Sequence, residues 1–350
     1  MTRRNAVVWI LFLIGASAVI GLFPQFFELF SVINATIYAS MGILTLSLAL
    51  IWGYCGIISF GQTAFFGLGG YTYAVAAINF GDSTPAVVLG LVVPTLFAAL
   101  LGYFMFWGRV TDVYLGVITL TVSLILYKLF NATAGDAYHI GRAALGGFNG
   151  IRGLPGSKFP GSSATPLINL PWDPDTTLEV EDIWYVAASL LCASYMLVRW
   201  LLSTNLGHLM VAIRENEQRT ELLGYDVRRV KLVAFIIGGA MAGAAGILFA
   251  NCVFVSPTMF SLLYTAQVIV WVIIGGLGTL VGPVFACFLL QGVTAELGRL
   301  NWLNPNFVLG VILIASVLLM PSGILPTLQR AYENFRWPVR LRATRRQPAQ

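Results

Sequence analysis

Few residues of this chain have the types and spacing that catalysis or metal binding requires. Its two histidines, His139 and His208, form no His-Glu-x-x-His motif, and no hydrolytic Ser/His/Asp set falls on one side of the apolar segments. The cysteines lie in or at the ends of apolar segments without paired spacing: Cys55, Cys192, Cys252 and Cys287. We therefore expect no catalytic residue and no metal site, which argues against an intramembrane enzyme.

Nucleotide-binding motifs are absent from the sequence. Residues 275–283, GGLGTLVGP, are glycine-rich, but Val281 stands where the third glycine of Gly-x-Gly-x-x-Gly would be, and no strand precedes them. The phosphate-binding pattern Gly-x-x-x-x-Gly-Lys-Ser/Thr occurs nowhere in the chain. We expect this chain to bind no cofactor, so any ATP that drives it is hydrolysed by another subunit.

The segment 203–230 is the most informative polar stretch. Leu209, Ala212 and Ile213 repeat at helical spacing, whereas Arg214 and Glu217 belong to a charged face. The pattern predicts a short amphipathic helix with a glycine stop at its end. Such a helix could lie on the membrane surface or contact a partner protein, and its pattern alone leaves both roles open.

A few polar residues inside apolar segments could line a path for a polar solute: Gln62, Thr119, Thr121, Ser123 and Gln267. Hydroxyls that bond back to helix carbonyls are the alternative explanation for most of them. Residues 53–62, GYCGIISFGQ, are polar and flexible enough to form a re-entrant or broken helix, although close packing explains their glycines equally well. Charged residues deep in the apolar segments are nearly absent, which argues against proton coupling.

The elements that carry these residues are membrane helices. The chain has 350 residues, of which 58% are hydrophobic and 10% charged, and its mean hydropathy is +0.82. Its apolar runs are continuous, not alternating, which predicts an all-α polytopic bundle with about ten crossings and no β-barrel. The expected spans are 6–23, 33–53, 60–80, 86–107, 112–131, 184–202, 231–250, 263–281, 283–297 and 305–320.

The distribution of cations predicts the orientation. With both termini in the cytoplasm, fifteen of the 20 Lys and Arg residues face that side and four face outside, while Lys128 lies inside a span near its outer end. The net charge of +5 is therefore explained by topology, and we expect no nucleic-acid partner. Ala16-Ser17-Ala18 resembles a signal-peptide cleavage site, but the apolar run continues to Phe23, which favours an uncleaved first span.

The predicted organisation is a transmembrane domain, 1–328, followed by a basic cytoplasmic tail, 329–350. Residues 132–183 form an outer loop with many Gly and Pro residues, long enough to cap the structure or touch a partner. Residues 203–230 form the main cytoplasmic loop.

Several motifs, in order, resemble the permeases of high-affinity branched-chain amino acid ABC importers, of the LivM type. They cover most of the chain: GYCGIISFGQTAFFGLGGY at 53–71, GGFNGIRGLPG at 146–156, AIRENE at 212–217 followed by Gly224, VSP at 255–257, the glycine-rich 275–283 and PSGI at 321–324. Any one of these motifs is weak evidence. Their shared order makes the resemblance specific.

This resemblance implies a non-catalytic permease subunit in a bacterial cytoplasmic (inner) membrane. Its implied partners are membrane lipid, a homologous second permease, two ATP-binding cassette subunits and a periplasmic or extracellular solute-binding protein. The loop from Gly207 to Gly224 would dock on the ATPase, with coupling residues Gly207, Arg214, Glu215, Asn216, Glu217 and Gly224. The bulky Gln218, Arg219 and Thr220 depart from the small residues often found there, which affects the fine docking geometry.

The resemblance leaves the solute open. Branched-chain or other amino acids are the first expectation, and urea or short-chain amides are the alternative, because permeases of this family serve all of these. A stand-alone facilitator or channel is the third hypothesis, distinguished by transport that needs no ATPase.

Overall fold

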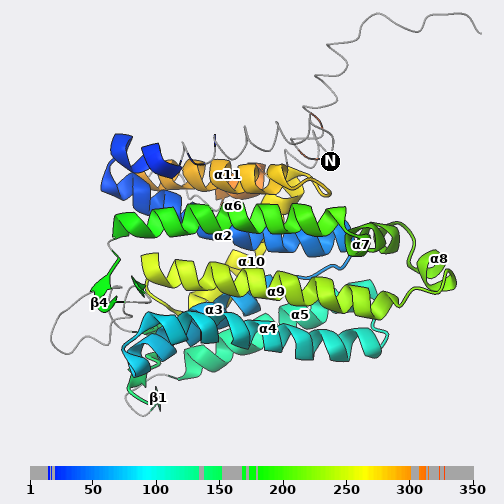
Figure 1. Ribbon diagram of the computed structural model, residues 1–350, viewed down its shortest axis with the longest axis horizontal. Coiled ribbons are helices and arrows are strands. Elements are labelled where there is room, and N and C mark those ends of the chain that lie inside the picture. Colours follow the sequence, from blue (N-terminus) through cyan, green and yellow to red (C-terminus); the bar gives the residue numbers. More distant parts are fainter. Residues whose placement is uncertain are drawn as a thin grey trace, which may run out of the picture.

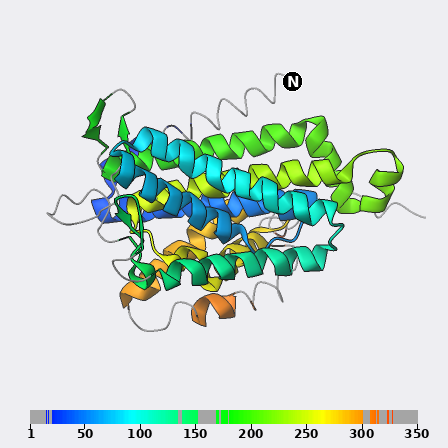
Figure 2. The same cartoon turned by 90° about the horizontal axis from the view of Figure 1, so that it is seen from below.

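A computed structural model describes residues 15, 17, 20–133, 138–151, 168–170, 173–178, 180–300, 307–312, 314, 323 and 327. Most of these residues form helices that lie side by side along one axis (Figures 1 and 2). The α-helices are α2 (Leu29–Cys55), α3 (Gln62–Phe80), α4 (Ser83–Trp107), α5 (Asp112–Ala132), α6 (Val180–Ser203), α7 (Asn205–Glu215), α8 (Glu217–Leu222), α9 (Val227–Cys252), α10 (Leu262–Gly275) and α11 (Val281–Leu300).

Within these ranges six helices are long and apolar enough to cross a membrane: α2, α4, α5, α6, α9 and α11. The predicted all-α membrane bundle is confirmed, and the chain is a multi-pass membrane protein. The prediction of a span over 263–281 was wrong in its last part, because α10 ends at Gly275 and Gly276 and Gly278 adopt positive φ angles of 105° and 88° in the turn that follows. The expected spans 6–23 and 305–320 lie largely outside the described residues.

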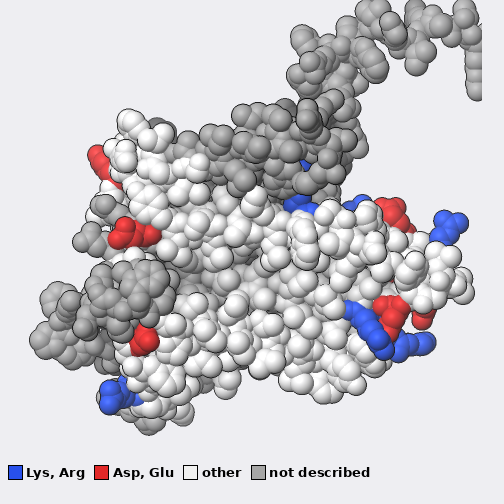
Figure 3. All heavy atoms as spheres, in the orientation of Figure 1, with Lys and Arg blue, Asp and Glu red and all other residues white. Residues whose placement is uncertain are grey.

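The connections gather at two opposite ends of the bundle (Figure 1). One end, called here the α8 end, holds α7, α8 and the turns before α5 and α11. The other, the β end, holds two antiparallel strand pairs that the sequence did not predict: β1 (His139–Ile140) with β2 (Ala143–Ala144), and β3 (Asn169–Leu170) with β4 (Asp173–Thr177). On the face in Figure 3 the charged side chains lie at these two ends and leave an uncharged band between them.

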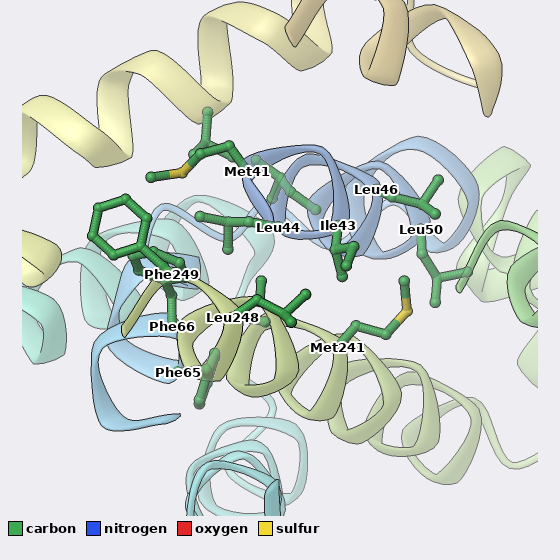
Figure 4. Packing of buried hydrophobic residues seen from close by; sticks show 14 of the residues in the cluster. Met41, Ile43, Leu44, Leu46, Leu50, Phe65, Phe66, Met241, Leu248 and Phe249 are labelled. Atoms are coloured by element: carbon green, nitrogen blue, oxygen red, sulfur yellow. The ribbon is translucent and has the colours of Figure 1, made fainter. Parts of the chain in front are cut away.

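The core lies between α2, α3 and α9. Leu44 of α2 lies near Phe66 of α3 and Leu248 of α9, whereas Leu50 lies further along α2, toward Met241 of α9 (Figure 4). The centroids of the Phe66 and Phe249 rings are 5.3 Å apart. Glycines allow this close approach, since a Cβ added at Gly246 of α9 would overlap the Phe66 carbonyl oxygen. Gly246 therefore allows α9 to pack directly on the backbone of α3.

Helix α3 begins well inside the bundle. After Cys55 the chain continues as a non-helical segment, 56–61, which starts with Gly56 in the left-handed region (φ 76°). Gln62 then bonds Ser47 and the Gly238 carbonyl. Ser47 lies eight residues before the end of α2, which places Gln62 about 12 Å inside that end at 1.5 Å per residue. Of the two alternatives left open for 53–62, the structure shows a broken helix over 56–61, and Gly61 is also closely packed against Thr119.

A second non-helical segment, 253–261, enters from the opposite end. It follows α9 at the β end and contains a 3₁₀ turn, η2 (Pro257–Phe260), whose Phe260 ring lies against Gly67 of α3. Helix α10 then runs to the α8 end for only 14 residues, about 21 Å. The first turns of α3 and α10 meet inside the bundle, where the Thr63 and Thr265 hydroxyls are 2.7 Å apart.

Candidate functional site

The predicted amphipathic helix over the segment 203–230 consists of two short helices joined at Asn216. Thr204 caps α7 by accepting a bond from the Gly207 amide. Asn216 ends α7 in an extended conformation, and its side-chain oxygen accepts a 2.8 Å bond from the Arg219 amide, which caps α8. Gly224 follows with φ 89°, so the predicted glycine stop is confirmed. The result is a compact protrusion at the α8 end (Figure 1).

Helix α7 packs tightly against the helix before it. Gly207 lies on the end of α6, where an added Cβ would overlap the backbone of Leu202 and the Leu201 carbonyl oxygen. Met210 and Ile213 are buried under α7. The apolar face predicted from helical spacing is therefore correct at Ile213 and wrong at Ala212, which is exposed, while Leu209 is half-buried. The protrusion is therefore fixed to the bundle along α7 and projects from it at α8.

Arg214 connects α7 to the end of α2. Its guanidinium donates a hydrogen bond to the Gly53 carbonyl oxygen, one of the last carbonyls of α2, and also lies 3.2 Å from the Glu215 carboxylate. Nearby, the Tyr54 hydroxyl donates a 2.8 Å bond to the Gly278 carbonyl in the turn after α10. The glycine-rich turn, the end of α2 and α7 thus meet at one junction. Glu215 is 69% exposed and is the residue of this group that faces solvent.

Glu217 contacts the bundle through Lys231. The Lys231 ammonium of α9 lies 2.7 Å from the Glu217 carboxylate at the start of α8 and 3.5 Å from the Asp112 carboxylate at the start of α5. The Lys231 side chain is only 8% exposed. Sequence reasoning missed this residue by counting it with the loop cations. The available signal was its position in the apolar run that begins at Val230, where a cation requires partners.

A cleft of about 630 Å³ opens beside this ion-pair group. It lies between the turn from α4 to α5 on one side and α8 with the start of α9 on the other. Its lining includes positively and negatively charged side chains: Arg109, Asp112, Glu217, Glu221, Asp226, Arg228 and Lys231. Such a surface suits a polar protein partner better than a lipid chain.

The five residues predicted for a solute path do not form one surface. Gln62 is 2% exposed and holds α2 and α9 together through the bonds already described. Thr119 and Ser123 are also buried, and Thr119 accepts a 3.1 Å bond from the Phe60 amide of the segment 56–61. Thr121 lies on the exposed face of α5, with its hydroxyl bonded back to Val117, and Gln267 is half-buried on α10.

Two further buried hydroxyls, those of Thr63 and Thr265, lie near Ser123 where α3 and α10 meet. Thr63 contacts Thr265 at 2.7 Å and Ser123 at 3.5 Å. Neither threonine was predicted, although Thr63 directly follows Gln62. This cluster joins the two interrupted helices to α5 inside the apolar bundle.

No group of three or more His, Cys, Asp or Glu side chains in the described part of the chain is arranged to hold a metal ion. The ion pairs of Lys231 at the α8 end join α9 to α5 and α8. Ion pairs between helices can transmit movement from one helix to another.

Comparison with known proteins identifies a matching family model, "Branched-chain amino acid transport system / permease component", over residues 30–317. The permease LivM of the high-affinity branched-chain amino acid transport system of Escherichia coli (strain K12) is 31% identical over 304 residues, which cover 81% of this chain and 67% of LivM. LivM of Salmonella typhimurium is 30% identical over 90% of this chain and 75% of its own length. The autoinducer 2 import permease LsrC of Photorhabdus luminescens is 26% identical over 45% of this chain and 50% of LsrC. No solved structure matches the chain.

Proposed function

Because the chain belongs to the family of permease components of branched-chain amino acid transport systems, we propose that it is the membrane subunit of an ABC importer that moves branched-chain amino acids inward. The observation that carries this proposal is the α7–α8 protrusion, which is tied to α2 through Arg214 and to α5 and α9 through Glu217. A chain without a nucleotide motif needs such a connection in order to respond to ATP hydrolysis elsewhere.

The proposal places the α8 end in the cytoplasm of a bacterium, with the segment 203–230 as the ATPase-coupling loop and the β end outside. Two ATP-binding cassette subunits would bind at the protrusion, a homologous permease would pair with this chain in the inner membrane, and a solute-binding protein would deliver solute to the β end. The concentration of Lys and Arg residues in the loops of the α8 end supports this orientation, because cationic loops are retained in the cytoplasm.

In this arrangement ATP-driven closure of the ATPase subunits displaces α7 and α8. Arg214 then pulls on the end of α2, next to the segment 56–61. Because the bundle is tightly packed, its helices shift between discrete packing arrangements and do not deform gradually. The residues assigned to coupling are Gly207, Arg214, Glu215, Asn216, Glu217 and Gly224. Thr121 and Gln267, which are not buried, remain proposed contacts of the solute path between the two permeases.

Reconstitution in liposomes tests the function. The chain is combined with its second permease, its ATPases and its binding protein. Uptake of labelled leucine and of labelled urea is then measured with and without ATP on the side of the membrane where the ATPases lie. We expect ATP-dependent uptake of leucine and none of urea. ATP-dependent uptake of urea alone would show that the solute is urea or a short amide. Uptake by this chain without its ATPases would show that the chain is a facilitator and not a subunit of an ABC importer.

A further inference from the structure

Lys231 occupies an unusual position for a cation. It lies one turn inside α9, its side chain is 8% exposed, and the residues around it in α9 are largely apolar. A buried ammonium is costly unless it is paired, and both of its partners are carboxylates. Asp112 and Glu217 each stand at the first residue of a helix, where the helix dipole also favours a negative charge. The three charges therefore hold one another and three helix ends together.

The two carboxylates belong to elements with different roles. Glu217 begins α8, the part of the protrusion that extends furthest from the bundle, while Asp112 begins α5. Asp112 and Glu217 are about half-exposed, so they are bound mainly through the one buried cation between them. A displacement of α8 that carries Glu217 along draws on Lys231 and, through it, on the start of α5.

Helix α5 in turn supports the interrupted segment 56–61. Two turns into α5, the Thr119 hydroxyl accepts the Phe60 amide, and its carbonyl lies so close to Gly61 that a Cβ there would overlap it. On the opposite flank, Arg214 of α7 holds the Gly53 carbonyl just before the segment. The protrusion is thus connected to both flanks of the non-helical segment, through Arg214 on the α2 side and through Lys231 on the α5 side.

We propose that Lys231 is a positioning residue for transport: it links α8 to α5, so that movement of the coupling loop shifts α5 against the segment 56–61. This inference rests on the proposed function, and it assigns Glu217 a contact within the bundle where the sequence had suggested a contact with the ATPase. It predicts that loss of the link lowers the number of solute molecules moved per ATP hydrolysed, without preventing assembly of the complex.

The test uses the full complex in liposomes and measures solute uptake and ATP hydrolysis in the same sample. Asp112→Asn removes the α5 arm and leaves the 2.7 Å Glu217–Lys231 pair, so the variant should fold. Lys231→Met removes both arms, and Lys231→Arg keeps the charge. The matched control is Glu296→Gln, which removes a carboxylate from an exposed pair with Arg299 near the opposite end of the bundle.

We expect Asp112→Asn and Lys231→Met to assemble and hydrolyse ATP while moving at least three-fold less solute per ATP, with Lys231→Arg restoring most of the ratio and Glu296→Gln unchanged. Combining Asp112→Asn with Lys231→Met should add little, because both changes remove the same link. An unchanged ratio in Asp112→Asn would overturn the inference even if Lys231→Met fails to assemble. A wild-type complex without ATP-dependent uptake would instead overturn the proposed function on which the inference rests.

Discussion

At the scale of single residues, buried polar contacts between helices should matter more for stability than for solute recognition. Gln62→Met keeps the size of the side chain but leaves Ser47 and the Gly238 carbonyl without their donor. We expect a loss of about 1–3 kcal/mol in the free energy of unfolding, the usual cost of an unsatisfied buried group. Unfolding of the purified permease by a titration with dodecyl sulfate measures this loss.

Thr121→Val is the matched control for this change. The Thr121 hydroxyl bonds only to the Val117 carbonyl of its own helix among the described contacts, and the side chain is exposed on α5. We expect its stability to change by less than about 0.5 kcal/mol. Equal losses in the two variants would contradict the structural role assigned to Gln62.

Close backbone contact between α3 and α9 gives a second prediction at this scale. Gly246→Ala places a methyl group against the Phe66 carbonyl oxygen, so the two helices must separate, at a cost of about 1–3 kcal/mol in unfolding free energy. Gly292→Ala in α11 is the control, because nothing lies within 4 Å of a Cβ added there. The same denaturant titration should show no loss for the control, and a tolerated Gly246→Ala would contradict the packing.

Sequence and structure agree unevenly for individual residues. The glycine stop at Gly224 follows from local pattern and was predicted correctly. The apolar face of α7 was predicted only in part, because Ile213 is buried but Ala212 is exposed and the buried Met210 was not included. Lys231 was missed because its partners lie 14 residues away at Glu217 and on a distant helix at Asp112, and no local pattern reports such a pairing.

At the scale of elements, the joint between α7 and α8 depends on one side chain. Asn216→Ala removes the oxygen that caps α8, and we expect this six-residue helix to lose about 1 kcal/mol of stability and to fray. Hydrogen exchange of the amides in 217–222 should accelerate accordingly.

The control for the joint is Asn216→Asp, which keeps an acceptor at the same position and places a negative charge at the N-terminus of the helix. Its amides should exchange as slowly as those of the unchanged protein. Fast exchange in both variants, or slow exchange in both, would show that the cap does not hold α8.

Helix lengths were predictable where one long apolar run crosses the membrane. They were less predictable where a crossing consists of a non-helical segment followed by a shorter helix. The runs that became α2, α4, α5, α6 and α9 are continuous, so their lengths follow directly from the need to cross the membrane. Helix α10 is shorter than predicted at its C-terminal end, where Gly276 and Gly278 adopt positive φ angles, and η2 precedes it within the same crossing. Such an arrangement depends on contacts with α3 and α5 that no local pattern contains.

At the scale of the whole molecule, the proposed orientation is open to a direct labelling test. In a variant without its native cysteines, single cysteines are introduced at Leu222, which is 88% exposed at the α8 end, and at Phe148, which is 70% exposed at the β end. We expect a membrane-impermeant thiol reagent to label position 148 in intact cells, and position 222 only after the membrane is permeabilised.

Position 148 labelled only after permeabilisation, together with free labelling of position 222, would reverse the orientation and place the coupling loop outside. The matched pair controls for reactivity, since both sites are exposed and both are tested in the same background. The charge distribution predicted this orientation from sequence, whereas the strand pairs of the β end were not predicted because their strands are only two to five residues long and show no alternation of apolar and polar residues.

The buried segment 56–61 also has a consequence for how the protein is made. Gln62 reaches its place only when it can bond the Gly238 carbonyl, which is 176 residues further along the chain. At about 5–20 residues per second, the ribosome needs about 9–35 s to synthesise that distance. During this interval the Gln62 side chain lacks the α9 carbonyl that accepts its hydrogen bond, and an unpaired polar group is poorly tolerated in the bilayer core. Stable insertion of α3 at its final depth therefore follows the synthesis of α9, so the order of membrane insertion differs from the order of the sequence.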